Sequence, residues 1–294
     1  MPVETKIKPK KIRRLNVQAM AVREHRVVGG LVADEGRTFV ACDIISAEPV
    51  ISAMISQDPY YKYAVYEGVG KDPFWHKGVL MIADVYLMYA SVCPITASKI
   101  KEKFDPEEWK VDPEAVKKKL KAERSICKVV VLAGAYGVGV DKLHTIFREA
   151  GYTITKEEVR QAHAAYWELF SKIKKSKNGL TKLVERDGYL INWFGFKATP
   201  RKAVDGFNLM AQSTVAGMMG LYLMLLFKQI KEDAVDALFV SQIHDAIILD
   251  VVDEDIEKFK VTNLKAIQQF NDEMQWELKM RTDYNSGKSF KDLK

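Results

Sequence analysis

The sequence predicts an α+β fold, in which an antiparallel sheet is combined with a mainly helical region. Strand-like runs rich in Val, Ile and Phe occur near both ends of the chain, at residues 27–32, 36–45, 237–240 and 246–252. Between them, apolar residues recur at helical spacing, interrupted by Pro and Gly. With 294 residues, of which 48% are apolar, the chain can bury a sizeable core as one large domain or two subdomains.

Each expected element follows from local signals. Residues 34–36 read as a turn that joins the first two strands, and residues 47–90 read as two or three helices. Asp-Pro pairs at Asp105 and Asp112 are typical helix N-caps, and they open a charged helix that continues to Arg124. Two amphipathic helices follow, and the second begins at a Thr155–Glu158 capping box.

The last third of the chain returns to the sheet. Residues 188–200 alternate enough for a hairpin, and residues 205–232 read as one long, largely buried helix. Residues 237–240 and 246–252 form a second hairpin, and the chain from Asp253 onward is expected to be a polar helix.

Composition limits the partners and the compartment. The net charge of +6 and the pI of about 8.9 favour an anionic partner such as nucleic acid, although many basic proteins bind none. Cys42, Cys93 and Cys127 are widely spaced without a C-x2-C pair, which indicates buried, reduced thiols. No stretch approaches the ~20 apolar residues of a membrane span, and residues 1–14 carry six cations without an apolar signal segment. We therefore expect a cytoplasmic protein without a membrane partner.

Residues 124–137, RSICKVVVLAGAYG, carry the most distinctive spacing in the chain. In a helix, steps of four residues rotate by only about 40°, so Arg124, Lys128, Leu132 and Tyr136 would form one stripe. Two cations would suit a triphosphate, and an aromatic ring would suit a base or a sugar. Propensity alone favours a buried strand instead, because residues 129–133 are apolar and mostly β-branched.

Three motifs resemble family A DNA polymerases, the group that includes bacterial DNA polymerase I and several phage replicases. The pattern R-x3-K-x7-Y-G within residues 124–137 resembles the fingers-helix motif. Residues 41–56, ACDIISAEPVISAMIS, resemble the first palm motif, and residues 241–250, SQIHDAIILD, resemble the third. The motifs occur in the order of that family, which makes coincidence a poor explanation.

The resemblance implies a right-hand fold without a thumb. Residues 1–14 would be a basic flexible tail, which is either solvated or an arm that contacts phosphates. Residues 15–60 would form the first part of the palm, residues 61–187 the helical fingers, and residues 188–294 the rest of the palm sheet.

The resemblance also implies a reaction, the transfer of a nucleotide from a dNTP to a primer 3′-hydroxyl under the direction of a DNA template. Two Mg²⁺ ions, for which Mn²⁺ can substitute, would be held by Asp43, Asp245 and the backbone carbonyl of Ile44. Lys128 would act with them by neutralising the charge that develops on the triphosphate. For either aspartate alone, a solvated or capping side chain is the simpler interpretation.

Further roles are implied residue by residue. The dNTP would contact Arg124, Lys128, Leu132, Tyr136, Glu48 and Ile44. Glu48, often bonded to the helix Tyr in the family, would fill the space of a ribose 2′-hydroxyl, so that Glu48 and Tyr136 select deoxyribose. DNA would contact His244, Asn208, Gln212, Arg23 and Gln18, the first three in the minor groove. The plainer alternatives are a surface salt bridge for the two cations and buried hydrogen bonds for His244, Asn208 and Gln212.

The chain departs from the family at several positions. Leu132 stands where a Phe or Tyr packs on the base, Ala133 replaces a Gly, and Ala246 replaces the Glu after the second catalytic Asp. Val204 stands at the place of a minor-groove Arg, for which Arg201 or Lys202 is a possible substitute. His76 lies near a phosphate-facing His of the family, but a surface or packed His fits that loose alignment better.

Two other functions share this fold. A single-subunit RNA polymerase has a similar Arg/Lys/Tyr-Gly pattern, but Glu48 would obstruct a ribose. A catalytically idle DNA-binding replisome subunit is the second alternative, and the intact Asp43 and Asp245 weigh against it.

Only 42 residues precede Asp43, whereas several hundred precede it in the family. We therefore expect one half of a split polymerase, which is encoded by a phage and located in the host cytoplasm. A second polypeptide would supply the thumb, the remaining palm strands and an exonuclease-like domain, and would cover an unpaired sheet edge. A severed longer chain or a minimal one-chain enzyme is the alternative.

Overall fold

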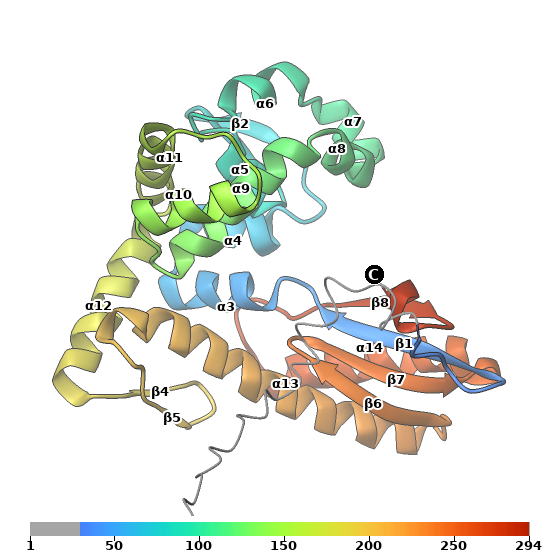
Figure 1. Ribbon diagram of the computed structural model, residues 1–294. Helices are drawn as coiled ribbons and strands as arrows, with labels where there is room; N and C mark the ends of the chain where they lie inside the picture. Colours follow the sequence, from blue (N-terminus) through green and yellow to red (C-terminus); the bar gives the residue numbers. More distant parts are fainter. Residues whose placement is uncertain (1–29, 294) are drawn as a thin grey trace, which may run out of the picture. The chain divides into compact units, whose positions relative to one another are not determined.

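The computed structural model describes residues 30–293 (Figure 1). The chain divides into two compact units. The first contains residues up to 43, together with residues 226–265 and residues from 282 onward; the second contains residues 44–225 and 266–281. The expected tail, the expected strand up to residue 29, and the expected DNA contacts Gln18 and Arg23 lie outside the described residues.

A four-stranded sheet forms the framework of the first unit, with the strand order β6-β7-β1-β8 (Figure 1). Its strands are β1 Arg37–Ile44, β6 Ala237–Ile243, β7 Ala246–Val252 and β8 Thr282–Gly287. β7 pairs antiparallel with both β1 and β6. The antiparallel sheet and the β6–β7 hairpin confirm the α+β prediction.

The central position of β1 and β7 follows from their sequences. TFVACDI and AIILDVV are nearly continuous apolar runs, as expected for strands that are covered on both faces. Val40, Cys42, Leu249 and Val251 have no exposed surface. Phe259, which is fully buried, belongs to helix α14 Ile256–Met274, the polar helix expected after the turn η3 Asp253–Asp255.

The described part of the sheet differs from the sequence predictions at two places. Within the described residues, the expected strand at 27–32 contributes only an isolated bridge between Val32 and Ser289. Gly30 disfavours a strand at that position because it has no side chain to pack. β8 was not predicted, because TDYNSG is polar and lacks an apolar alternation.

Helices dominate the second unit. They are α3 Ala47–Ser56, α4 Pro59–Lys62, the π-helical turn η1 Tyr63–Glu67, α5 Val85–Ala90, α6 Ala97–Lys103, α7 Pro106–Val111, α8 Pro113–Lys119, α9 Lys121–Ala135, α10 Val140–Glu149, α11 Lys156–Leu169, α12 Ser171–Asp187 and η2 Ala203–Asp205. The long helix α13 Gly206–Glu232 begins in this unit. The predicted hairpin at 188–200 is present as β4 Leu190–Ile191 and β5 Lys197–Ala198, whereas the hairpin of β2 Phe74–His76 and β3 Val79–Met81 was not predicted.

Side-chain caps fix several of these helices. The carboxylates of Asp105 and Asp112 accept hydrogen bonds from backbone N–H groups at 2.9 Å, and a proline follows each. The expected charged helix is divided into α7, α8 and α9: the Asp-Pro pairs start α7 and α8, and a break in helical geometry at Leu120 separates α8 from α9. The Thr155–Glu158 capping box at the start of α11 is confirmed.

The core of the second unit is aromatic. The fully buried rings of Tyr61 and Tyr166 lie 4.9 Å and 5.2 Å from Phe170, between ring centroids. All three cysteines are buried and none forms a disulfide, as predicted. By length and composition alone, one segment within residues 30–293, Ala203–Glu232, could cross a membrane; half of its apolar window is buried inside the protein, as in a core helix.

Candidate active site

Residues 124–135 of the stretch 124–137 are helical and form most of α9, and Tyr136 is its C-cap residue. Cys127, Val130 and Val131 are buried on one face, while Arg124, Lys128, Leu132 and Tyr136 remain at least partly accessible on the other. The strand favoured by propensity is therefore wrong, because burial of the β-branched side chains against neighbouring helices outweighs their local preference. The predicted stripe of two cations and an aromatic ring is present.

The Tyr-Gly pair has a structural cause. Gly137 has a φ of 67°, in the left-handed region that favours glycine. Its N–H donates to the carbonyl of Gly134 at 2.8 Å, and the N–H of Val138 donates to that of Ala133 at 2.9 Å. This is the Schellman arrangement that ends a helix, and it fixes Tyr136 as the C-cap residue.

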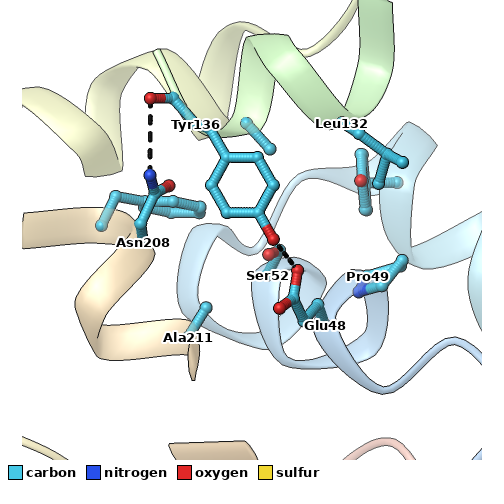
Figure 2. Close-up of a pocket in the computed structure, with 10 residues that line it drawn as sticks. Glu48, Pro49, Ser52, Leu132, Tyr136, Asn208 and Ala211 are labelled. Carbon is cyan, nitrogen blue, oxygen red and sulfur yellow. Dashed lines mark hydrogen bonds between the residues drawn. The ribbon is translucent and has the colours of Figure 1, made fainter. Parts of the chain in front are cut away.

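Tyr136 lies at the centre of a pocket between α3, α9 and α13 (Figure 2). Its phenol donates a hydrogen bond to the Glu48 carboxylate and accepts one from Gln212 Nε2 at 3.5 Å. Asn208 Nδ2 donates to the Tyr136 carbonyl at 3.4 Å. Burial, followed by the Glu48 hydrogen bond, raises the pKa of Tyr136 well above its usual value. The structure thus brings together four of the residues singled out in the sequence.

Arg124 and Lys128 of α9 share a neighbour outside this pocket, Tyr86. Arg124 Nε lies 2.8 Å from the carboxylate of Asp84, a buried side chain that also caps α5 by accepting the N–H groups of Tyr86 and Leu87 at 2.9 Å. The Arg124 guanidinium lies 4.9 Å from the Tyr86 ring centroid, and Lys128 Nζ lies 5.9 Å from it. The salt bridge considered for these cations is present for Arg124. Sequence reasoning missed Asp84 and Tyr86, although an Asp before an apolar helical run is a typical N-cap.

The two candidate metal ligands belong to the sheet of the first unit. Asp43 is paired with Ala246, the first residue of β7, and Asp245 immediately precedes Ala246. His244 and Asp245 form the two-residue turn between β6 and β7, where the φ of 54° at His244 is the left-handed conformation that such turns use. The two carboxylates therefore lie at the same end of the sheet, and both are at least partly accessible.

The chemistry of this pair fits a hard divalent cation. Mg²⁺ is commonly bound through one or two carboxylates together with substrate phosphates and water. No group of three or more His, Cys, Asp or Glu side chains within residues 30–293 is arranged to hold a metal ion. Backbone carbonyls, such as that of Ile44 next to Asp43 in the chain, and substrate oxygens are also ligands of the kind that Mg²⁺ takes.

The remaining predicted residues are dispersed. His244 is exposed at its turn, and His76 is exposed in β2, as expected for a surface His. Val204 is 52% exposed in η2, and Ile44 is buried at the end of β1.

Comparisons with known proteins agree with the motifs. Residues 11–292 match the family described as DNA polymerase family A. Among solved structures, the chain is similar to the POL domain of Pol1 from M. smegmatis, determined in complex with DNA primer-template and dNTP. The TM-score is 0.71 at 17% sequence identity, and the similarity covers 95% of this chain and 45% of that chain. This chain therefore spans less than half of that relative, and at this identity the likeness shows the fold alone. A search of the curated proteins finds no match. Because the family match extends over nearly the whole sequence, the chain belongs to DNA polymerase family A.

Proposed function

We propose that this chain is the catalytic palm and fingers portion of a DNA-templated DNA polymerase, which transfers a nucleotide from a dNTP to a primer 3′-hydroxyl. The observation that carries the proposal is the pair of Asp43 and Asp245 at one end of the sheet, in a chain of this family. Two-metal nucleotidyl transfer needs two accessible carboxylates close together, and Asp43 at the end of β1 and Asp245 in the turn before β7 meet that need.

The carboxylates of Asp43 and Asp245, with the carbonyl of Ile44, would hold two Mg²⁺ ions, or Mn²⁺ in their place. Bound there, the ions would lower the pKa of the primer hydroxyl and neutralise charge on the leaving pyrophosphate. Ala246 follows Asp245, so no third carboxylate is supplied at that position. The contribution of the chain is to hold two hard oxygen ligands at the end of a buried, rigid pair of strands.

Other groups would bind the dNTP. Arg124 and Lys128 would bind the triphosphate, because a guanidinium fork and an ammonium group both suit phosphate oxygens. Leu132 would contact the base without the stacking that an aromatic ring provides. Glu48, held by the Tyr136 phenol, would occupy the space of a 2′-hydroxyl and exclude ribose.

The DNA would be recognised through the minor groove. His244, Asn208 and Gln212 carry donors that can reach the acceptors shared by all correct base pairs. Gln18 and Arg23, outside the described residues, are proposed as additional DNA contacts. A protein that works on DNA in this way is proposed to be cytoplasmic.

Primer extension by the wild-type chain and by Asp43→Asn and Asp245→Asn tests the proposal. Each substitution should reduce extension by at least a hundredfold while it leaves binding of primer-template DNA within about threefold, because a charged ligand is lost and no cationic contact is removed. Glu273→Gln, an exposed change on α14, is the matched control. Near-normal extension by either Asn variant would refute the site. Extension with NTPs in preference to dNTPs would favour an RNA polymerase instead, and DNA binding without any extension would favour an idle subunit.

We further propose that a second polypeptide, supplying a thumb and an exonuclease-like domain, binds this chain. Support comes from β6, an edge strand of the sheet within residues 30–293, on which Leu238, Phe239 and Val240 are 56%, 47% and 40% exposed. Exposed apolar side chains on an unpaired edge are an unstable arrangement in a lone protein. Long processive products from the purified chain alone would contradict this proposal, whereas short products that lengthen when a co-purifying chain is added would support it.

A further inference from the structure

The aromatic ring of Tyr86 lies beside two cations of α9, Arg124 and Lys128. The Arg124 guanidinium carbon lies 4.9 Å from its centroid and Lys128 Nζ lies 5.9 Å from it, both within the distance at which a cation is attracted to a ring face. Arg124 and Lys128 are four residues apart on one helix, so their side chains project from the same face. One ring therefore contacts two like charges on the same helix face.

The ring is held in place from its own helix. Asp84 caps α5 through the N–H of Tyr86, and the same buried carboxylate pairs with Arg124 at 2.8 Å. Tyr86 is itself mostly buried, and burial, followed by the charge of Asp84, raises the pKa of its phenol, while Arg124 opposes this. Asp84 and Tyr86 thus form one rigid support that contacts α9 through its cations.

We propose that Tyr86 is a positioning residue for the incoming nucleotide, whose ring orders the Arg124 and Lys128 side chains before the triphosphate binds. The inference rests on the proposed polymerase function and adds a residue that acts on phosphate affinity. Long cationic side chains lose considerable rotamer freedom when they bind a ligand, and a side chain that is already ordered loses less. Because Asp84 neutralises only one of the two cations, the pair keeps an excess positive charge for the triphosphate.

The first experiment measures steady-state primer extension by Tyr86→Leu and Tyr86→Phe. The Leu variant should raise the KM for dNTP by about tenfold and leave kcat within about twofold, whereas the Phe variant, which keeps the ring, should stay within about twofold of wild type in both. Inhibition by inorganic tripolyphosphate should weaken in parallel with the KM in the Leu variant. Inhibition by a deoxynucleoside without phosphates should not change.

Tyr189→Leu is the matched control. Lys197 Nζ lies 3.9 Å from the Tyr189 ring centroid, so this variant removes a cation–ring contact from the same unit but away from α9. Its KM for dNTP should equal that of wild type. An equal rise in KM in both Leu variants would overturn the proposal, as would an unchanged KM in Tyr86→Leu.

A fluorinated-phenylalanine series at position 86 separates the ring's electrostatic role from its packing. Stepwise fluorination weakens the negative ring face with little change of shape, so the KM for dNTP should rise with each added fluorine while the thermal unfolding midpoint stays constant. A KM for dNTP that stays unchanged across the fluorinated series would overturn the proposal, even if Tyr86→Leu fails to fold. Failure of the wild-type chain to extend any primer would instead contradict the proposed polymerase function.

Discussion

The phenol of Tyr136 donates a hydrogen bond to the carboxylate of Glu48, joining the end of α9 to the first turn of α3 (Figure 2). The contact holds a carboxylate in a pocket that is also lined by Leu132 and Asn208. Because the Glu48 carboxylate is held in place, it keeps filling its part of the pocket. A ligand with an additional group at that position would clash with it.

Glu48→Ala should therefore relax sugar selection. Removal of the side chain opens space for a hydroxyl group, and we expect the preference for dNTP over NTP in kcat/KM to fall by about tenfold or more. Competition assays with both nucleotides measure this ratio. Glu185→Ala, at an exposed position of α12, should leave the ratio unchanged. An unaltered preference in Glu48→Ala would place the sugar selection elsewhere.

The same contact predicts how sugar selection depends on pH. Burial and the Glu48 hydrogen bond raise the pKa of Tyr136 above its ordinary value of 10.0, so the phenol keeps its proton and remains a donor well beyond neutral pH. The stability that this raised pKa contributes is fully present below 10.0 and is lost only above it. The dNTP/NTP preference should consequently be flat from pH 7 to pH 9, and a decline within that range would show that Tyr136 ionises earlier.

Gly137 should be required for the position of Tyr136. At a φ of 67°, an alanine would be strained, and its Cβ would lie 1.5 Å from Lys177 Nζ, which would have to move. We expect Gly137→Ala to destabilise the protein by about 1–2 kcal/mol and to weaken sugar selection as well, because the last turn of α9 would end differently. Gly139→Ala is the control, since that residue has a φ of −75° and open space around the position of a Cβ. Urea unfolding of both variants checks the difference.

The sequence predicted those parts of the molecule whose signals are local. The Asp105 and Asp112 caps and the central strands β1 and β7 follow from residues adjacent in the chain. β8 escaped prediction because a polar edge strand is specified by its partners rather than by its own pattern.

In the candidate site, too, local sequence patterns predicted some features, whereas others depend on contacts between distant residues. The spacing of Arg124, Lys128 and Tyr136 was legible, and the resemblance implied a bond between Glu48 and Tyr136, which is present. That the segment is a helix could not be decided locally, because the run of valines favours a strand until neighbouring helices bury it. The contact of Tyr86 with both cations joins residues about forty positions apart and had no signal in the sequence.

Asp58 is a buried carboxylate that caps α4 and connects it to the first turn of α12 in the second unit. One of its oxygens accepts the N–H groups of Tyr60 and Tyr61 at 3.1 Å and 3.2 Å, and the other accepts the N–H of Lys172 in α12 at 3.1 Å. Asp58→Ala leaves all three donors unpaired and should cost about 2–4 kcal/mol in the free energy of unfolding, whereas Asp58→Asn retains one acceptor and should cost less.

The pH dependence of this loss has a definite sign. Burial raises the pKa of Asp58 above 3.8, and the backbone hydrogen bonds only partly oppose it. Between the unfolded and folded pKa values the folded state binds more protons, so the contribution of Asp58 to stability is fully present below 3.8 and falls as the pH rises through the folded value. The stability advantage of the wild type over Asp58→Asn, whose side chain does not titrate, should therefore be larger at pH 4 than at pH 7. Urea unfolding of both proteins at the two pH values measures this difference in the free energy of unfolding. A difference that is larger at pH 7 than at pH 4 would contradict the prediction. It would mean that the three N–H groups stabilise the charged carboxylate more than burial disfavours it.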